Sequence, residues 1–262
     1  MLLHHIEIGQ GQPLVLLHGL FGCADSWLPI ARKLSTSFRV LCLDLRNHGR
    51  SPHALTHTYA DMAADVIETL DAIGVSRSHM LGHSMGGRVA TTIAAMQPQR
   101  IDRLVLADIA PLSALVNKKT IAHIEAHRQT LHALQALDLS QLRSFAQIEA
   151  QLASSIPDQR LRRSMLKNIE RNSDGHFSHR LNTIVLLQHI ETIAQGHSPW
   201  RLPVHTLLLK GQSSDYVSPN DIEIMRGLCP TLTVRELPNA GHWIHIDCPQ
   251  LVTEHTANFL SL

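Results

Sequence analysis

Short, continuous apolar runs alternate with a helical pattern in the first 110 residues. Residues 14–17, 38–43 and 104–107 are such runs, and each is typical of a strand buried on both faces of a sheet. Residues 59–73 place apolar side chains on one face of a helix, which Gly74 ends. Residues 2–8 alternate in part, which indicates an edge strand. This succession predicts an α/β fold with a mostly parallel sheet.

The pattern changes at Pro111. From there to about residue 199 the chain is polar and helical in period, no run is convincing as a strand, and residues 184–187 are ambiguous. The alternation resumes with a strand at residues 203–209, a helix after Pro219, a strand at 232–234 and a helix over 249–260. We therefore predict a core over residues 1–110 and 200–262, with a helical cap inserted over residues 111–199.

Composition restricts the class of protein. The 262 residues are 44% hydrophobic and 17% charged, as in ordinary globular proteins, and the net charge of +1 does not favour nucleic acid. No apolar stretch approaches the roughly 20 residues of a membrane span. The N-terminus lacks a signal-peptide pattern, and the four cysteines lack C-x-x-C spacing. We expect a cytoplasmic protein, a monomer or weak homodimer, that acts on a small molecule.

Histidine is unusually frequent, with 19 copies. His123 and His127 lie one helical turn apart, a spacing that two ligands of one metal ion can have. No H-E-x-x-H motif accompanies them, and no third ligand lies near them in the sequence. We expect most of these histidines at the surface and predict neither a metal nor a cofactor.

The motif with the most chemical content is the G-x-S-x-G sequence of residues 82–86, centred on Ser84. It lies between a strand-like run at 78–81 and an Ala-rich helical pattern at 88–96. A serine on a sharp strand-to-helix turn is a nucleophile elbow, and glycines fit where the backbone doubles back. The alternative is a serine in a tight turn with only a structural role.

A serine nucleophile needs a base, and histidine titrates near neutrality. On this kind of fold the order along the chain is Ser, acid, His. His242, in the glycine-containing turn after the last predicted strand, is the expected base, and His245 is expected to pack behind it. Two aspartates fit the order: Asp215 follows the strand at 203–209, and Asp108 follows the strand at 104–107. From the residues alone both remain open.

An oxyanion formed at Ser84 needs two hydrogen-bond donors. The Met85 amide, at the start of the helix after the elbow, is one candidate, and the Leu20 amide in the His-Gly-Leu-Phe-Gly loop is the other. The side chains of Phe21 and Trp243 are expected to contact substrate as part of an apolar rim.

Five segments together resemble the α/β-hydrolase superfamily, and two of them, 44–52 and 108–111, are similar to the YbfF-type esterases and their mitochondrial relatives. The segments are His-Gly-Leu-Phe-Gly (18–22), Asp-Leu-Arg-Asn-His-Gly-Arg-Ser-Pro (44–52), Gly-His-Ser-Met-Gly-Gly (82–87), Asp-Ile-Ala-Pro (108–111) and Gly-His-Trp (241–243). The resemblance implies a mostly parallel sheet of about eight strands with a helical cap. It also implies hydrolysis of carboxylic esters or thioesters without a cofactor.

The resemblance also bears on the acid. Most α/β-hydrolases carry it in a G-x-x-D pattern, but here Ser214 occupies that position and Asp215 comes one residue later. In the YbfF-type branch the acid follows the preceding strand, which corresponds to Asp108, and Ser214 would add a hydrogen bond. We therefore expect Asp108 as the acid, with Asp215 as the alternative.

The leading hypothesis is a serine carboxylesterase or thioesterase that cleaves small to medium acyl esters through an acyl-enzyme on Ser84. A carbon–carbon bond hydrolase and a cofactor-free haloperoxidase are alternatives on the same fold. A ligand-binding receptor with a slow triad is an alternative of another class. Arg162, Arg163 and Lys167 of the cap are expected on a solvated helix face, with contact to a phosphate-bearing thiol carrier as the alternative.

Overall fold

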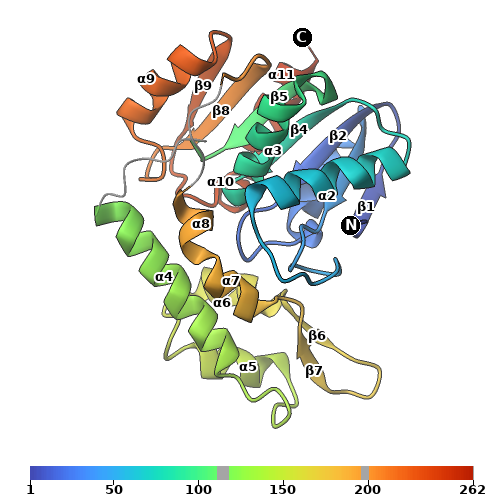
Figure 1. The fold of residues 1–262 in the computed structure, drawn as a ribbon. Helices are drawn as coiled ribbons and strands as arrows, with labels where there is room; N and C mark the ends of the chain where they lie inside the picture. Colours follow the sequence, from blue (N-terminus) through green and yellow to red (C-terminus); the bar gives the residue numbers. More distant parts are fainter. Residues whose placement is uncertain (111–117, 196–200, 262) are drawn as a thin grey trace.

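The computed structural model describes residues 1–110, 118–195 and 201–261. In this part of the chain, seven strands form one sheet in the order β1-β3-β2-β4-β5-β8-β9 (Figure 1). β1 runs antiparallel to β3, and the other neighbouring strands are parallel. The strands are β1 His5–Ile8, β2 Gln12–Leu17, β3 Phe38–Leu43, β4 Ser78–His83, β5 Ile101–Ala107, β8 His205–Gly211 and β9 Leu232–Leu237.

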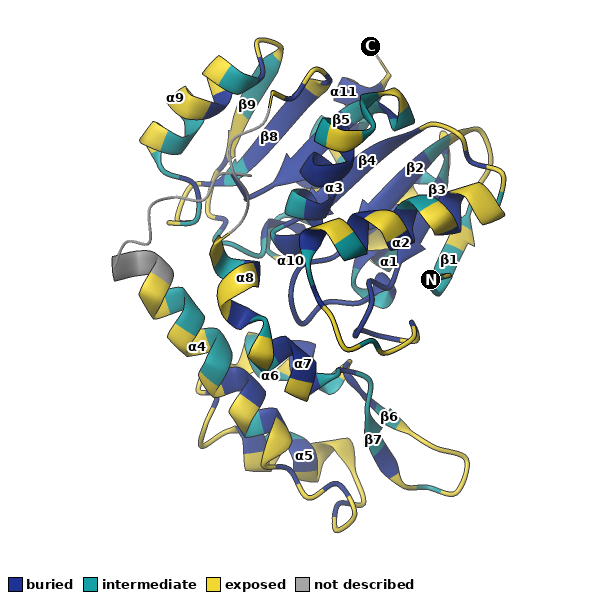
Figure 2. Cartoon of the chain, in the orientation of Figure 1, coloured by how far each residue is buried: buried dark blue, intermediate teal, exposed yellow. Residues whose placement is uncertain are grey.

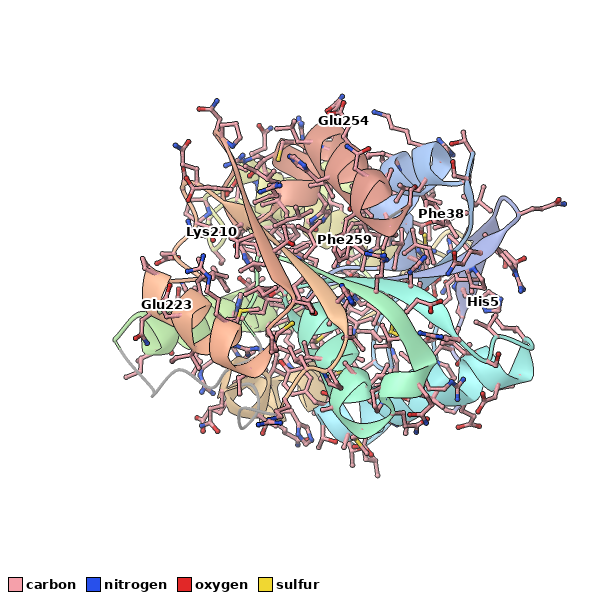
Figure 3. All side chains as sticks on the ribbon, turned by 90° about the horizontal axis from the view of Figure 1, so that it is seen from above. His5, Phe38, Lys210, Glu223, Glu254 and Phe259 are labelled. Atoms are coloured by element: carbon pink, nitrogen blue, oxygen red, sulfur yellow. The ribbon has the colours of Figure 1, made fainter. Side chains whose placement is uncertain are left out.

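Helices cover both faces of this sheet, as the continuous apolar runs require. In β2, Leu14 and Leu16 face one apolar cluster, while Val15 and Leu17 face the other. Figure 3 looks down on the sheet, with Phe38 and Phe259 labelled on the face covered by α1 and α11, and shows α2 and α3 on the opposite face. The helices of the core are η1 Ala24–Trp27, α1 Leu28–Leu34, α2 Tyr59–Ala72, α3 Met85–Met96, η2 Pro98–Arg100, α9 Pro219–Leu228, α10 Ile244–Asp247 and α11 Pro249–Leu260.

Between β5 and β8, residues 118–195 form a separate layer of mostly helical structure below the sheet in Figure 1. Its long helix α4 packs against α7 and α8, with Leu131 and Leu134 fully buried, and Figure 2 shows the exposed face of α4 turned outward. The elements of this cap are α4 Lys118–Gln135, α5 Phe145–Leu152, α6 Gln159–Leu166, β6 Ile169–Arg171, β7 Phe177–His179, α7 Thr183–Gln188 and α8 Ile190–Gln195.

Two expectations about these elements are wrong. Within the described residues the sheet has seven strands where about eight were expected, because a single strand, β1, forms its antiparallel edge and the turn at Gly9 leads directly into β2. The cap is not purely helical, because β6 and β7 form an antiparallel hairpin whose turn contains Gly175 at a φ of 89°. Each of these strands has only three residues, too few to produce a visible alternation.

Other expectations hold or remain predictions. The ambiguous residues 184–187 lie in helix α7, and the helices at 59–73 and 249–260 form as α2 and α11. The predicted boundaries between core and cap, at residues 110/111 and 199/200, involve residues outside the described ranges. None of the helices in the described parts of the chain combines the length and the apolar character that a membrane crossing requires.

Candidate active site

Ser84 lies on the sharp turn between β4 and α3 and has a φ of 50° and a ψ of −117°. Glycine is required around it, because a Cβ atom at Gly82 would overlap the backbone of Gly86, and one at Gly86 would overlap the carbonyl of Leu17. The Ser84 amide donates to the Ala107 carbonyl on β5, at 3.2 Å. The turn therefore fixes the serine at the carboxyl end of the central strands.

His242 lies in the loop between β9 and α10, and its imidazole Nε2 is 3.0 Å from Ser84 Oγ. Hydrogen bonds to three different segments help hold this loop: Ser213 N–H donates to the Ala240 carbonyl, the Gly241 amide donates to Asp247, and His83 Nε2–H donates to the His242 carbonyl. His83, the second residue of the G-x-S-x-G motif, thus ties the loop of the expected base to the elbow.

Asp108 is the carboxylate that the structure places against His242, with Oδ2 2.8 Å from Nδ1. It lies directly after β5, is fully buried, and has a φ of 52°. The Gly211 amide donates to Oδ1 at 2.8 Å, and the Ser214 hydroxyl donates to Oδ2. Burial raises the pKa of Asp108 to about 6, although these two hydrogen bonds oppose the rise.

Asp215, the alternative acid, points elsewhere. Its side chain is 49% exposed, and its Oδ1 lies 3.3 Å from His123 Nε2 on α4. Ser214, by contrast, contacts the Asp108 carboxylate that also meets His242. The geometry therefore groups Ser84, His242, Asp108 and Ser214, and leaves Asp215 outside the group.

Hydrogen bonding and burial set the state of the His242 imidazole. Burial lowers its pKa well below the usual value, and His127 and His245 lower it further, so the ring is neutral at neutral pH. Because Nδ1 faces the Asp108 carboxylate, it carries the proton and Nε2 keeps its lone pair. That lone pair faces the Ser84 hydroxyl, as a base requires.

The loop of residues 18–22 approaches the elbow closely. A Cβ atom at Gly19 would lie 3.2 Å from the Ser84 Cβ. His18 holds the loop: its Nε2 accepts from the Leu45 amide at 3.0 Å, so Nδ1 carries the proton and donates to the Gly19 carbonyl at 2.8 Å. Leu20 is the next residue after Gly19, and its oxyanion role stays a prediction.

Met85 is the first residue of α3, where an amide has no acceptor inside the helix. Among the predicted substrate contacts, Phe21 is buried and its ring meets that of His127 edge to face, with centroids 5.5 Å apart. Trp243 is half-buried, with its ring 5.9 Å from that of His83. Trp243 thus lies beside the elbow through His83, Phe21 lies against the cap, and the roles of these residues in binding remain predictions.

Several contacts around the site carry no sequence motif. Asn168 of the cap is buried and donates to the Phe21 carbonyl at 2.7 Å, which supports the left-handed backbone of Phe21 at a φ of 66°. The ring of Tyr216 stacks on the imidazole of His242. Neither contact could be predicted from the sequence, because each joins two segments that are distant along the chain and that do not belong to one motif.

The Asp-Leu-Arg-Asn-His-Gly segment makes hydrogen bonds to loops of the core and to the cap. Asp44 accepts from the Ala24 and Arg50 amides, and Asn47 accepts through its backbone carbonyl from the amide of Asn182 in the cap, at 3.0 Å. His245, which was expected to pack behind His242, is buried and packs against the ring of His83 instead, with centroids 4.5 Å apart. These contacts fix loops that lie behind the serine and join the cap to the core.

Comparison with known proteins identifies the family of this chain. Residues 12–249 match the model of the α/β hydrolase fold family. The chain belongs to that family. A curated relative from Xenopus tropicalis, the sn-1-specific diacylglycerol lipase ABHD11, is 36% identical over 95% of this chain and 78% of its own. Esterase YbfF of Escherichia coli is 31% identical over 96% of this chain and 94% of its own.

A solved structure agrees with the sequence relatives. A marine microorganism esterase superposes with a TM-score of 0.92 at 35% identity, over 98% of this chain and 99% of its own. The expected resemblance to YbfF-type esterases is therefore confirmed, and so is the expected class, a hydrolase of ester bonds.

Proposed function

We propose that this protein is a serine carboxylesterase or acyl thioesterase that cleaves small to medium acyl esters through an acyl-enzyme on Ser84. The observation that carries the proposal is the continuous relay in which His242 Nε2 lies 3.0 Å from Ser84 Oγ and its Nδ1 lies 2.8 Å from Asp108 Oδ2. A neutral imidazole with this tautomer is a general base for the serine hydroxyl.

In the acylation half-reaction, His242 Nε2 accepts the proton of Ser84 as Oγ attacks the substrate carbonyl carbon. Asp108 stabilises the resulting imidazolium, and Ser214 and Gly211 hold the carboxylate in place. When the tetrahedral intermediate collapses, the bond from carbon to the leaving oxygen or sulfur breaks. His242 then donates its proton to the leaving alkoxide or thiolate.

In the deacylation half-reaction, His242 takes a proton from water, whose oxygen attacks the acyl carbon on Ser84. Collapse of the second tetrahedral intermediate returns the proton to Ser84 Oγ and releases the carboxylic acid. The oxyanion of both intermediates would accept hydrogen bonds from the Leu20 and Met85 amides, which lie in the loop against Ser84 and at the first position of α3.

A fluorophosphonate probe tests the proposed nucleophile. We expect stoichiometric labelling of the native protein, located on Ser84 by peptide mass spectrometry, and no labelling of Ser84→Ala. A native protein that stays unlabelled while it remains folded would refute the proposed mechanism and favour a receptor on the same fold.

A substrate panel tests the proposed class of ester. It contains p-nitrophenyl esters of increasing acyl length, acyl-CoA thioesters, and a diacylglycerol, since one relative is named as a diacylglycerol lipase. We expect the highest kcat/KM for short or medium p-nitrophenyl esters. A preference for diacylglycerol, or no cleavage of any ester in the panel, would contradict the proposed size of substrate.

A further inference from the structure

Tyr216 lies face to face with the imidazole of His242. The two ring centroids are 3.4 Å apart, and the planes differ by 9°. Tyr216 follows Ser214 by two residues, and its amide donates to the Ser214 hydroxyl oxygen at 3.3 Å. The stacked ring therefore belongs to the same loop that holds the Asp108 carboxylate.

The charge of His242 changes the energy of this stack. Two neutral aromatic rings disfavour full face-to-face overlap, because their quadrupoles repel. A cation over the ring face is attracted, with the strongest effect in places shielded from water. The side chain of His242 is only 14% exposed. The Tyr216 face thus favours the imidazolium over the neutral imidazole, and the imidazolium is the form that develops during proton transfer from Ser84.

The cap holds Tyr216 from its other side. His123 of α4 stacks on the opposite face of the phenol, with centroids 4.2 Å apart and planes that differ by 8°. One helical turn later, the Nε2 of His127 lies 3.5 Å from the Tyr216 hydroxyl. Asp215 pairs with His123, which anchors the same loop to α4. The His123 and His127 spacing considered for a metal thus serves contacts to one tyrosine.

We propose that Tyr216 is a positioning residue for the base, which orients His242 and stabilises its imidazolium form, and that His123 on cap helix α4 keeps Tyr216 in place. The inference rests on the proposed function, because it assumes that His242 accepts the proton of Ser84. It extends that function by linking the cap directly to the rate of proton transfer.

Substitution at Tyr216 gives the first test. Tyr216→Phe keeps the ring and loses the hydroxyl, so we expect kcat within about threefold of the native value. Tyr216→Leu loses the aromatic face, and we expect kcat to fall about tenfold or more with KM within about twofold. Equal kcat values for the Leu and Phe variants would overturn the proposal.

A series of progressively fluorinated phenylalanines at position 216 separates charge stabilisation from packing. Fluorine withdraws electron density from the ring face with little change in shape, so kcat should fall stepwise from phenylalanine to the most fluorinated residue. A merely structural role for the ring predicts no such trend. A flat series would overturn the proposal even if Tyr216→Leu is inactive or does not fold.

The role of the cap has its own pair of variants. We expect His123→Gln to lower kcat about threefold or more, and His132→Gln, at an exposed position on the same helix, to leave it unchanged. Equal effects of the two variants would overturn the part assigned to α4. Fluorophosphonate labelling of the native protein distinguishes failure of this inference from failure of the proposed function. If the native protein is labelled and active and the Tyr216 variants keep its kcat, this inference alone is refuted. If the native protein is not labelled, the proposed function is refuted.

Discussion

Replacement of Asp108 by asparagine is the sharpest test of the relay. The amide oxygen of the new side chain can still accept from the Gly211 amide, and the Ser214 hydroxyl can rotate to accept from the amide nitrogen. The same amide nitrogen would face His242 Nδ1, which in the native protein lies 2.8 Å from Oδ2 of the carboxylate. Two donors cannot face each other, so the imidazole proton moves to Nε2. The base then presents a proton, not a lone pair, to Ser84.

The size of the effect follows from this change of tautomer. An equivalent Asp-to-Asn change in a serine-protease triad lowers kcat by about 10⁴, which corresponds to about 5 kcal/mol in the barrier. We expect a loss of this order for Asp108→Asn in initial rates with a p-nitrophenyl ester. The fold should persist, because burial already raises the pKa of Asp108 and therefore disfavours its charge at pH 7. The Tm at pH 7 is thus expected to be equal to the native value or higher.

Asp215→Asn is the matched control. Its carboxylate is half exposed, and an asparagine oxygen at the same place can still accept a hydrogen bond from His123, so the loop stays anchored and kcat should change by less than about threefold. The assignment is wrong if Asp108→Asn retains turnover within tenfold of native while Asp215→Asn loses orders of magnitude. Unfolding of Asp108→Asn, measured by circular dichroism, would show that the carboxylate is needed for the fold as well.

Two further measurements test the surroundings of the relay. Asp108 and His242 are close enough to share a proton, and uptake of one proton by the pair removes the base, whichever of the two groups holds it. We therefore expect kcat/KM to fall tenfold for each pH unit below a pH of about 6. A kcat/KM that stays level down to pH 4 would contradict this coupling. Gly19→Ala adds a methyl group 3.2 Å from the Ser84 Cβ and should lower kcat at least tenfold in a folded protein. The control is Gly227→Ala, on an exposed helix face with open space around the new carbon, which should keep full activity and gain about 0.5–1 kcal/mol in unfolding free energy. Native-like kcat for Gly19→Ala would show that the loop does not approach the reacting atoms.

The core of the fold could be predicted because each strand there is a visible physical signal. The last four residues of β2, β3 and β5 are buried on both faces of the sheet and are unbroken apolar runs, while α2 shows one apolar face and a glycine shortly after its end. The same holds for the nucleophile: overlap with the neighbouring backbone requires glycine at positions 82 and 86. A steric requirement of this kind restricts which residue type can occupy a position, and such a restriction can be recognised in a single sequence.

The cap could not be predicted in the same detail, because the signals there are short or absent. A hairpin with three residues in each strand has no readable period, and the turn that joins β6 to β7 resembles any polar loop. The expected eighth strand came from the resemblance alone, and nothing in residues 1–11 required a second strand beside β1. A feature that is expected only from resemblance to a family, and that no steric or hydrophobic requirement of the sequence enforces, can be absent from an individual member.

The cap, whose structure was the least predictable from the sequence, makes contacts with the core that affect the candidate active site. The relay itself lies in core loops at the carboxyl ends of β4, β5 and β9. Each of two loops beside it is held by a cap residue: the Phe21 carbonyl by Asn168, and the Tyr216 ring by His123. A change at Asn168 or His123 therefore alters the placement of groups around Ser84. Substitutions at these two cap positions should therefore lower kcat, whereas a cap that does not position the core loops would leave kcat unchanged.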